Sequence, residues 1–282
     1  MKKILLLGST GKMGGAIRRA FDDGYDLIEK SSKDFDAADF RSVSLLVKEI
    51  RPDIVINAVA YLGIDPCEKA PYDALQLNTL YPRYLAELAN ELNFLLIHFS
   101  TDAVFSDSSG AYFTESDTPS PLNVYGFTKL GGDLFIQNIA KRYYICRISI
   151  LFGETEKENQ FIEKMLSKVK AGEKVLKVSH DIISSPSYAF DIALEVRNII
   201  EKSMEYGTYH IANQGSASLY DLMTEIAKGL KLDLDILGVS HLEFPALGRK
   251  NTCTPISSEK IGALRPWQDA VREYCERKKS VK

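Results

Sequence analysis

The chain has 282 residues, of which 45% are apolar and 26% are charged, and its formal net charge is −3 at pH 7. This composition predicts a globular protein with a large core. The small negative charge, without a long basic run, argues against nucleic-acid and membrane-surface partners and leaves small molecules as the expected ligands. Four scattered cysteines form no CxxC pair, which predicts neither a disulfide framework nor a zinc site. The apolar run near the N-terminus ends at Gly8, too short for a secretory signal, so we expect a cytoplasmic protein.

The first 150 residues alternate short apolar runs with amphipathic stretches, a pattern typical of a parallel sheet covered by helices. The expected strands cover residues 3–8, 25–30, 53–60, 94–100 and 143–149, and the expected helices cover residues 13–21, 42–50 and 85–93. This order predicts an α/β fold with a doubly wound, Rossmann-like parallel sheet, in which ligands bind beyond the carboxyl ends of the strands.

The second half of the chain alternates less regularly and predicts a smaller, mixed α/β substrate lobe. We expect helices over residues 158–173, 185–202 and 218–230, the last capped by Ser218, and a strand over residues 207–213. Trp267 is expected to pack a terminal helix against this lobe. The predicted dinucleotide-binding domain covers residues 1–152 and about 187–213, and the predicted substrate lobe covers about 153–186 and 214–282.

Gly8, Gly11 and Gly14 form a GxxGxxG pattern between the first expected strand and helix. Glycines there let the backbone turn tightly and approach a pyrophosphate, whose charge the helix N-terminus favours. The pattern predicts dinucleotide binding, with a tight turn that binds nothing as the alternative. After the second strand, Glu29 suits the ribose hydroxyl of NADH, whereas the segment 30–33 (KSSK) suits the 2′-phosphate of NADPH. We expect NADPH, with NADH as the alternative.

Tyr125 and Lys129 lie four residues apart in "PLNVYGFTKLGGDLF", so a helix places them on one face. An ammonium beside a phenol lowers the pKa of the phenol, and such a tyrosine can pass a proton to a carbonyl oxygen as hydride reaches carbon. Ser100 and Thr101 follow the fourth expected strand, where a hydroxyl could hydrogen-bond the same oxygen.

Three glycines in the same stretch, at positions 126, 131 and 132, each disfavour a helix interior by up to about 1 kcal/mol. We expect them to let this helix lie close to the cofactor or to a neighbouring helix. His98 and His210 fall inside expected strands and are interpreted as hydrogen-bonded core residues rather than catalytic bases. No metal-binding spacing connects the four histidines, so we expect no required metal.

A series of segments along most of the chain resembles one known family. They are GSTGKMG, RPDIVINAVAY, FSTDAVF, ESDTPSPLNVYGFTKLGGD, ICRISILFG, SSPSYAFDIA and GTYHIANQGSASLYDL, in that order. The series resembles the extended short-chain dehydrogenases/reductases and, within them, the dTDP-4-dehydrorhamnose reductase family. The resemblance implies hydride transfer from NADPH or NADH to the C4 ketone of a nucleotide-linked 4-keto-6-deoxysugar. It is compatible with a homodimer.

The resemblance also implies roles for individual residues. Tyr125 would donate the proton, Lys129 would modulate its pKa and bind the ribose, and Thr101 would hydrogen-bond the sugar carbonyl. The implied cofactor-binding residues are Gly8, Thr10, Gly11, Lys12, Met13, Gly14, Asp36, Ala37, Ala58, Ala60, Tyr61, Tyr125 and Lys129. The implied substrate-binding residues are Thr101, Asp102, Ala103, Tyr125, Ile150 and Arg249.

Three positions depart from the family's pattern: Ala103 replaces a tyrosine, Ile150 a tryptophan, and Lys250 a proline. If Ala103 and Ile150 line the sugar pocket, the 4-keto sugar differs, and neutral drift is the alternative. Ala103 also takes the place of the glutamate that follows Asp102 in related dehydratases, which favours a reductase. Arg249 and Lys250 are candidates for binding the nucleotide diphosphate. Other readings are a non-catalytic regulatory subunit, as in the β subunit of methionine adenosyltransferase, and a nucleotide-sugar epimerase or epimerase-reductase.

Overall fold

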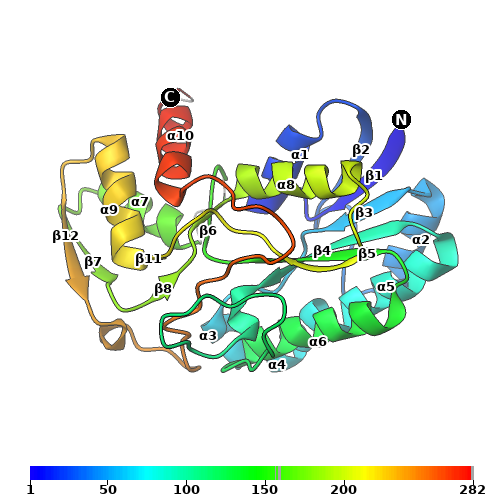
Figure 1. Cartoon of the computed structure of the whole chain (residues 1–282), viewed down its shortest axis with the longest axis horizontal. Coiled ribbons are helices and arrows are strands. Elements are labelled where there is room, and N and C mark those ends of the chain that lie inside the picture. Colours follow the sequence, from blue (N-terminus) through cyan, green and yellow to red (C-terminus); the bar gives the residue numbers. More distant parts are fainter. Residues whose placement is uncertain (156, 158–159, 281–282) are drawn as a thin grey trace.

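The computed structural model describes residues 1–155, 157 and 160–280 (Figure 1). Its centre is a six-stranded sheet in the order β10-β5-β4-β3-β1-β2, and every neighbouring pair is parallel. The strands are β1 (Lys2–Leu7), β2 (Tyr25–Lys30), β3 (Ile54–Asn57), β4 (Leu95–Thr101), β5 (Tyr143–Ile148) and β10 (Gly207–His210). The expected doubly wound sheet is confirmed, and β10 brings a segment from the second half of the chain to its edge.

Helices cover both faces of this sheet because successive strand residues point to opposite sides. Ile4 and Leu6 pack with α1 (Lys12–Ala20) and α8 (Ala189–Glu201), while Leu5 and Leu7 pack with α2 (Phe40–Ile50) and α5 (Tyr81–Leu92). The helix α6 (Val124–Ile139) lies beside α5 on the second face (Figure 1). A strand buried on both sides needs apolar residues at consecutive positions, which explains the run ILLL in β1.

A second lobe with its own apolar core lies beyond the carboxyl ends of the strands (Figure 1). Its elements are β6 (Leu151–Phe152), α7 (Phe161–Lys170), β7 (Val175–Ser179), β8 (Ile183–Ser184), β9 (Ser187–Tyr188), β11 (Ala217–Ser218), α9 (Leu219–Leu230), β12 (Asp235–Val239), η3 (His241–Glu243) and α10 (Trp267–Ser280). Ser218 caps α9 in a capping box, and Trp267 is buried in the core at the start of α10, as expected. Residues 158–159 of one expected helix lie outside the described residues, and α7 begins at Phe161.

Short helices between β3 and α5, and one after β4, were absent from the sequence prediction. They are α3 (Ile64–Lys69), α4 (Pro71–Leu75), the π-helical turn η1 (Gln76–Leu80) and the 3₁₀ turn η2 (Asp102–Val104). These pieces are too short to show a hydrophobic period, so a pattern search passes over them. No helix in the described part of the chain is long and apolar enough to cross a membrane.

The glycines of α6 let this helix approach its neighbours closely. A Cβ at Gly132 would lie 2.3 Å from the carbonyl oxygen of Asn78 in η1, and one at Gly126 would lie 2.1 Å from the carbonyl oxygen of Ala103. A Cβ at Gly131 would meet a side chain of the same turn, at 2.9 Å. The sequence predicted that these glycines let α6 approach either the cofactor or a neighbouring helix. The contacts found here are of the second kind.

We expect Gly132→Ala to lower the free energy of unfolding by about 1–3 kcal/mol, because the overlap with a backbone oxygen outweighs the better helix propensity of alanine. Urea denaturation measures this difference. Gly262→Ala is the control, since no described atom lies within 4 Å of a Cβ at that position. An unchanged midpoint for Gly132→Ala would contradict the packing explanation.

Candidate active site

The tertiary structure brings Thr101 and Tyr125 together beyond the end of β4. Thr101 is the last residue of β4, and Tyr125 is in the first turn of α6. The position of that turn is set by Asn123, the helix N-cap, whose side chain accepts a hydrogen bond from the backbone N–H of Gly126 at 2.9 Å. The amide nitrogen of Asn123 donates to the carbonyl oxygen of Arg249, also at 2.9 Å, so the second lobe supports the same turn.

The surroundings of the half-buried phenol of Tyr125 favour its protonated form. Burial raises the pKa of Tyr125 well above its ordinary value, and a hydrogen bond with Thr101 opposes this only in part. The sequence predicted the opposite direction, with Lys129 lowering the pKa of the phenol. That expectation is wrong for this structure, because the side-chain nitrogen of Lys129 bonds elsewhere. It donates to the carbonyl oxygen of Phe99 at 2.6 Å and lies 3.1 Å from Nε2 of His98.

The side chain of Lys129 is buried between α6 and the sheet. Burial lowers its pKa to about 8, and the charge of Asp133 opposes this shift. The side chain of Ser100 also points toward α6. Its hydroxyl donates to Asp133 at 2.8 Å, and Nε of Arg147 donates to the same carboxylate at 3.2 Å. Ser100 therefore supports a buried ion pair instead of facing Tyr125, and Thr101 alone supplies the expected hydroxyl at the site.

Asp102 anchors Thr101 rather than facing an open site. One of its oxygens accepts hydrogen bonds from the hydroxyls of Ser149 at 2.6 Å and Thr254 at 2.9 Å, and the other accepts from Thr101 at 3.1 Å. Burial raises the pKa of Asp102, while these hydrogen bonds lower it. The carboxylate is thus engaged by protein groups, contrary to its implied contact with substrate. Ser149 and Thr254 carry no motif of their own, and the sequence analysis missed them.

The glycine-rich turn leaves an open cradle at the N-terminus of α1. Gly8 has a φ of +87°, and a Cβ there would lie 2.9 Å from backbone atoms of Ala58. A Cβ at Gly14 would lie 2.5 Å from the carbonyl oxygen of Gly8, so the fold itself requires both glycines. At Gly11, the N-cap of α1, the nearest such atom is 3.4 Å away. The space in front of Gly11 fits an anionic group at the helix N-terminus, such as a pyrophosphate.

Lys12 and Met13 do not offer their side chains to this cradle. The ammonium of Lys12 contacts Glu163 of α7 and the carbonyl oxygen of Leu151, both at 3.2 Å, and burial lowers the pKa of Lys12. Met13 is buried in the core on the α8 side of the sheet. The sequence implied both as cofactor-binding residues, but only their backbone groups remain available for that role.

Thr10 lies in the glycine turn, and the other cofactor candidates outside α6 are in the segments that follow β2 and β3. Ala58, Ala60 and Tyr61 follow β3. The side chain of Asn78 accepts a hydrogen bond from the backbone N–H of Tyr61 and donates one to its carbonyl oxygen, both at 2.9 Å. Asp36 is exposed, and its carboxylate accepts a hydrogen bond from the backbone N–H of Ala38. Ala37 packs against the core. Glu29 at the end of β2 is bound by Arg18 of α1 at 2.7 Å, a partner that the sequence analysis missed.

Two substrate candidates have surroundings other than those implied. Ile150 packs against the apolar core of the second lobe. Lys250 donates to the carbonyl oxygen of Phe244 at 2.6 Å, so its ammonium is engaged within its own loop. Arg249 is exposed, with Asp107 at 3.8 Å, and lines a cavity of about 460 Å³ together with Lys250. Of these two cations, Arg249 is the better placed for an anionic ligand.

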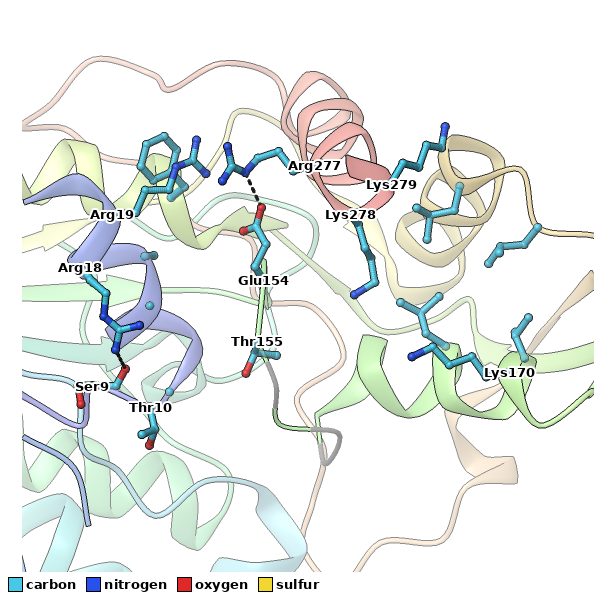
Figure 2. A pocket seen from close by; sticks show the side chains of 18 residues that line it. Ser9, Thr10, Arg18, Arg19, Glu154, Thr155, Lys170, Arg277, Lys278 and Lys279 are labelled. Atoms are coloured by element: carbon cyan, nitrogen blue, oxygen red, sulfur yellow. Dashed lines mark hydrogen bonds and ion pairs between the residues drawn. The ribbon is translucent and has the colours of Figure 1, made fainter. Parts of the chain in front are cut away.

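A larger cavity, of about 690 Å³, opens between α1 and the second lobe (Figure 2). It starts at Gly11 and has an apolar wall from α7 and α9. Its basic side chains are Arg18, Arg19, Lys170, Arg277, Lys278 and Lys279. Among the described residues that line it, the only acidic side chain is that of Glu154, which is bonded to Arg277 at 2.9 Å (Figure 2). The side of the glycine turn that faces the second lobe is therefore positively charged, which favours phosphate-bearing ligands.

The comparison with known families agrees with this architecture. The model described as the RmlD substrate binding domain matches residues 1–280. The chain belongs to the RmlD family. Two relatives to which it is similar are the spore coat polysaccharide biosynthesis protein SpsK of Bacillus subtilis and the dTDP-4-dehydrorhamnose reductase of Escherichia coli. The first is 31% identical over 286 residues and covers 100% of this chain and 99% of the relative. The second is 32% identical over 288 residues and covers 95% of each.

Two further matches of this RmlD-family chain bear on function. The structure of dTDP-4-dehydrorhamnose reductase from Bacillus anthracis in complex with NADP superposes with a TM-score of 0.92. It is 27% identical and covers 98% of this chain and 99% of that chain. The mouse methionine adenosyltransferase 2 subunit beta is 28% identical over 295 residues, which cover 96% of this chain and 86% of the relative.

The buried pair of Lys12 and Glu163 links the two lobes of this RmlD-family protein, and the second oxygen of Glu163 has no partner among the described residues. We expect Lys12→Met to destabilise the fold by about 3–5 kcal/mol, because it leaves a buried carboxylate unpaired. The double variant Lys12→Met/Glu163→Leu should recover most of this loss. Urea denaturation of the three variants measures the effect.

The control for this experiment is the exposed ion pair of Lys174 and Asp233. Lys174→Met should leave the unfolding transition unchanged, because solvent screens a surface pair. If Lys12→Met also left the unfolding transition unchanged, the buried pair would not stabilise the contact between the lobes.

Proposed function

We propose that this protein is an NADPH-dependent reductase of the C4 ketone of a nucleotide-linked 4-keto-6-deoxysugar. The observation that carries the proposal is the placement of the Tyr125 phenol beside the Thr101 hydroxyl, in a chain whose relatives include dTDP-4-dehydrorhamnose reductases. A reductase of this kind needs a hydride donor and one proton donor, and it needs no further acid or base.

The cofactor supplies the hydride, and the residues of the chain bind the reactants and supply the proton. The cradle at Gly11 would hold the pyrophosphate at the N-terminus of α1. Thr101 would turn its hydroxyl from Asp102 to the oxygen of the ketone. The O–H bond of Tyr125 breaks as a new O–H bond forms on that oxygen. The charge left on the phenolate is stabilised by Thr101 and by the cationic form of Lys129.

The preference for NADPH is supported by the ion pair between Arg18 and Glu29. The carboxylate that would bind a free ribose hydroxyl is already bonded to a guanidinium, and Arg18 adds positive charge at the end of β2. The NADP complex of the Bacillus anthracis relative supports the same choice. Asp36, Ala37, Ala58, Ala60 and Tyr61 would then line the adenosine half. Four free cysteines fit a reducing compartment such as the cytoplasm.

We assign cofactor binding to residues 1–152 and about 187–213, and substrate binding to about 153–186 and 214–282. The support is that α8 and β10 belong to the sheet layer, whereas α7, α9 and α10 share the core of the second lobe. The sugar nucleotide would lie between these parts, with Arg249 toward its diphosphate and Ala103 near the sugar.

The alternative is a non-catalytic regulatory subunit, which the similarity to the mouse methionine adenosyltransferase subunit suggests. A panel of dTDP-, UDP-, GDP- and CDP-linked 4-keto sugars, with product analysis, separates the two functions. The reductase consumes NADPH with at least one of them, whereas a regulatory subunit turns over none and copurifies with a synthetase.

We expect Tyr125→Phe to reduce kcat by at least about 100-fold while the Kd for NADPH changes little, since the substitution removes only the proton donor. In the wild-type protein, activity should persist from neutral into alkaline pH, because a raised pKa keeps the phenol protonated there. Steady-state kinetics across pH measures both effects. A Tyr125→Phe enzyme with normal turnover would exclude Tyr125 as the proton donor.

The glycine turn offers a second test with matched controls. Gly11→Ala should raise the Kd for NADPH at least tenfold, equivalent to about 1.4 kcal/mol, with little change in melting temperature, because its Cβ enters the cradle and not the protein. Gly14→Ala should instead lower the melting temperature. Gly15→Ala should affect neither, since no described atom lies within 4 Å of its Cβ. Fluorescence titration and thermal unfolding distinguish the three variants, and unaltered NADPH binding by Gly11→Ala would refute the cradle.

A further inference from the structure

His98 lies in a chain of hydrogen bonds that ends at Lys129. Asn57 and His98 are paired neighbours on the parallel strands β3 and β4. Their side chains contact through Nδ2 of Asn57 and Nδ1 of His98 at 3.0 Å, and Nε2 of His98 lies 3.1 Å from Nζ of Lys129. All three residues are buried, so each polar atom in the chain needs a suitable partner.

The backbone fixes the direction of this chain. The N–H of Val59 donates to Oδ1 of Asn57 at 3.1 Å, which leaves the amide NH₂ of Asn57 facing His98. An NH₂ group only donates, so Nδ1 of His98 must accept. A neutral imidazole that accepts at Nδ1 carries its proton on Nε2, and this N–H points at Lys129. An ammonium has no lone pair to accept it, whereas a neutral amine does.

The charges around Lys129 agree with a neutral amine. On α6, Asp133 is its buried acidic neighbour, and Arg147 of β5 already pairs with that carboxylate at 3.2 Å. Tyr125 on the same helix is protonated, and burial keeps His98 of β4 uncharged by lowering its pKa. An ammonium at Lys129 would add an uncompensated buried charge.

We propose that His98, oriented by Asn57, is a positioning residue that holds Lys129 as a neutral amine before cofactor and substrate bind. A neutral Lys129 does not favour the phenolate, so Tyr125 stays a proton donor, which is the form that a reductase requires. Protonation of Lys129 would break the contact with the Nε2 proton and release the ammonium to stabilise the phenolate. This consequence for catalysis rests on the proposed function, whereas the charge state of Lys129 does not.

The first test needs no substitution. In ligand-free protein labelled with ¹⁵N at histidine, two-bond ¹H–¹⁵N spectra report the tautomer of each imidazole. We expect the proton of His98 on Nε2 across neutral pH. A proton on Nδ1 would overturn the proposal, because Nε2 would then accept from an ammonium.

The second test follows Lys129 directly through ¹³C-labelled lysine side chains, with its signal assigned by its loss in Lys129→Arg. Burial opposed by Asp133 sets the pKa of Lys129 at about 8, and the Nε2 proton of His98 further disfavours the ammonium, so we expect the wild-type amine to titrate below about pH 7. In His98→Gln the amide oxygen can accept from an ammonium, so the pKa of Lys129 should rise by at least one unit, a tenfold gain in proton affinity. His210→Gln is the matched control: this buried histidine of β10 bonds to Phe113 and Ser257, and its loss should leave the Lys129 titration unchanged.

An unchanged titration in folded His98→Gln, or a wild-type amine that titrates at about pH 8 or above, would refute the role of His98. If His98→Gln does not fold, the wild-type tautomer decides. Because neither measurement uses a substrate, inactivity toward keto sugars would count against the proposed function alone. Where the enzyme is active, His98→Gln should lose activity at a lower pH than wild type, since a charged Lys129 lowers the pKa of Tyr125.

Discussion

The close approach of α6 to its neighbours is the constraint on which the candidate site depends. At Gly126 and Gly132 the helix backbone lies against carbonyl oxygens of Ala103 and Asn78, where any side chain would overlap. The loss of helix propensity, about 1 kcal/mol per glycine, is offset by this packing and by hydrogen bonds such as the one from the Thr79 hydroxyl to the carbonyl of Thr128 at 2.6 Å. Because Tyr125 lies in the first turn of this helix, the same packing places its phenol near the end of β4.

The same approach encloses a layer of polar groups between α6 and the sheet. Parallel register places Asn57 beside His98 and Ser100 beside Arg147, and α6 supplies Lys129 and Asp133. Polar groups cut off from water must satisfy each other, so their protonation states are set by the whole layer rather than by one neighbour. The interactions that stabilise α6 on the sheet are therefore also those that determine the chemistry of Lys129.

Polar contacts between the two lobes hold the second lobe against the candidate site. Glu163 binds Lys12 next to the glycine turn, Thr254 binds Asp102 next to Thr101, and the Arg249 segment binds the cap of α6. Each contact joins residues more than 120 positions apart. The second lobe therefore contacts the first beside the glycine turn, beside Thr101 and beside the helix turn that holds Tyr125.

The sequence by itself determined the parallel sheet, the glycine turn and the shared face of Tyr125 and Lys129, because these follow from local periodicity and from residues close together in the chain. It could not determine the direction in which Lys129, Ser100 and Lys12 point. Those side chains are buried, and their partners come from distant segments, so only tertiary packing brings donor and acceptor together. In this structure Lys129 does not lower the pKa of Tyr125, contrary to the prediction, for the same reason: helical spacing fixes which face a side chain occupies, whereas the surrounding sheet decides what it binds.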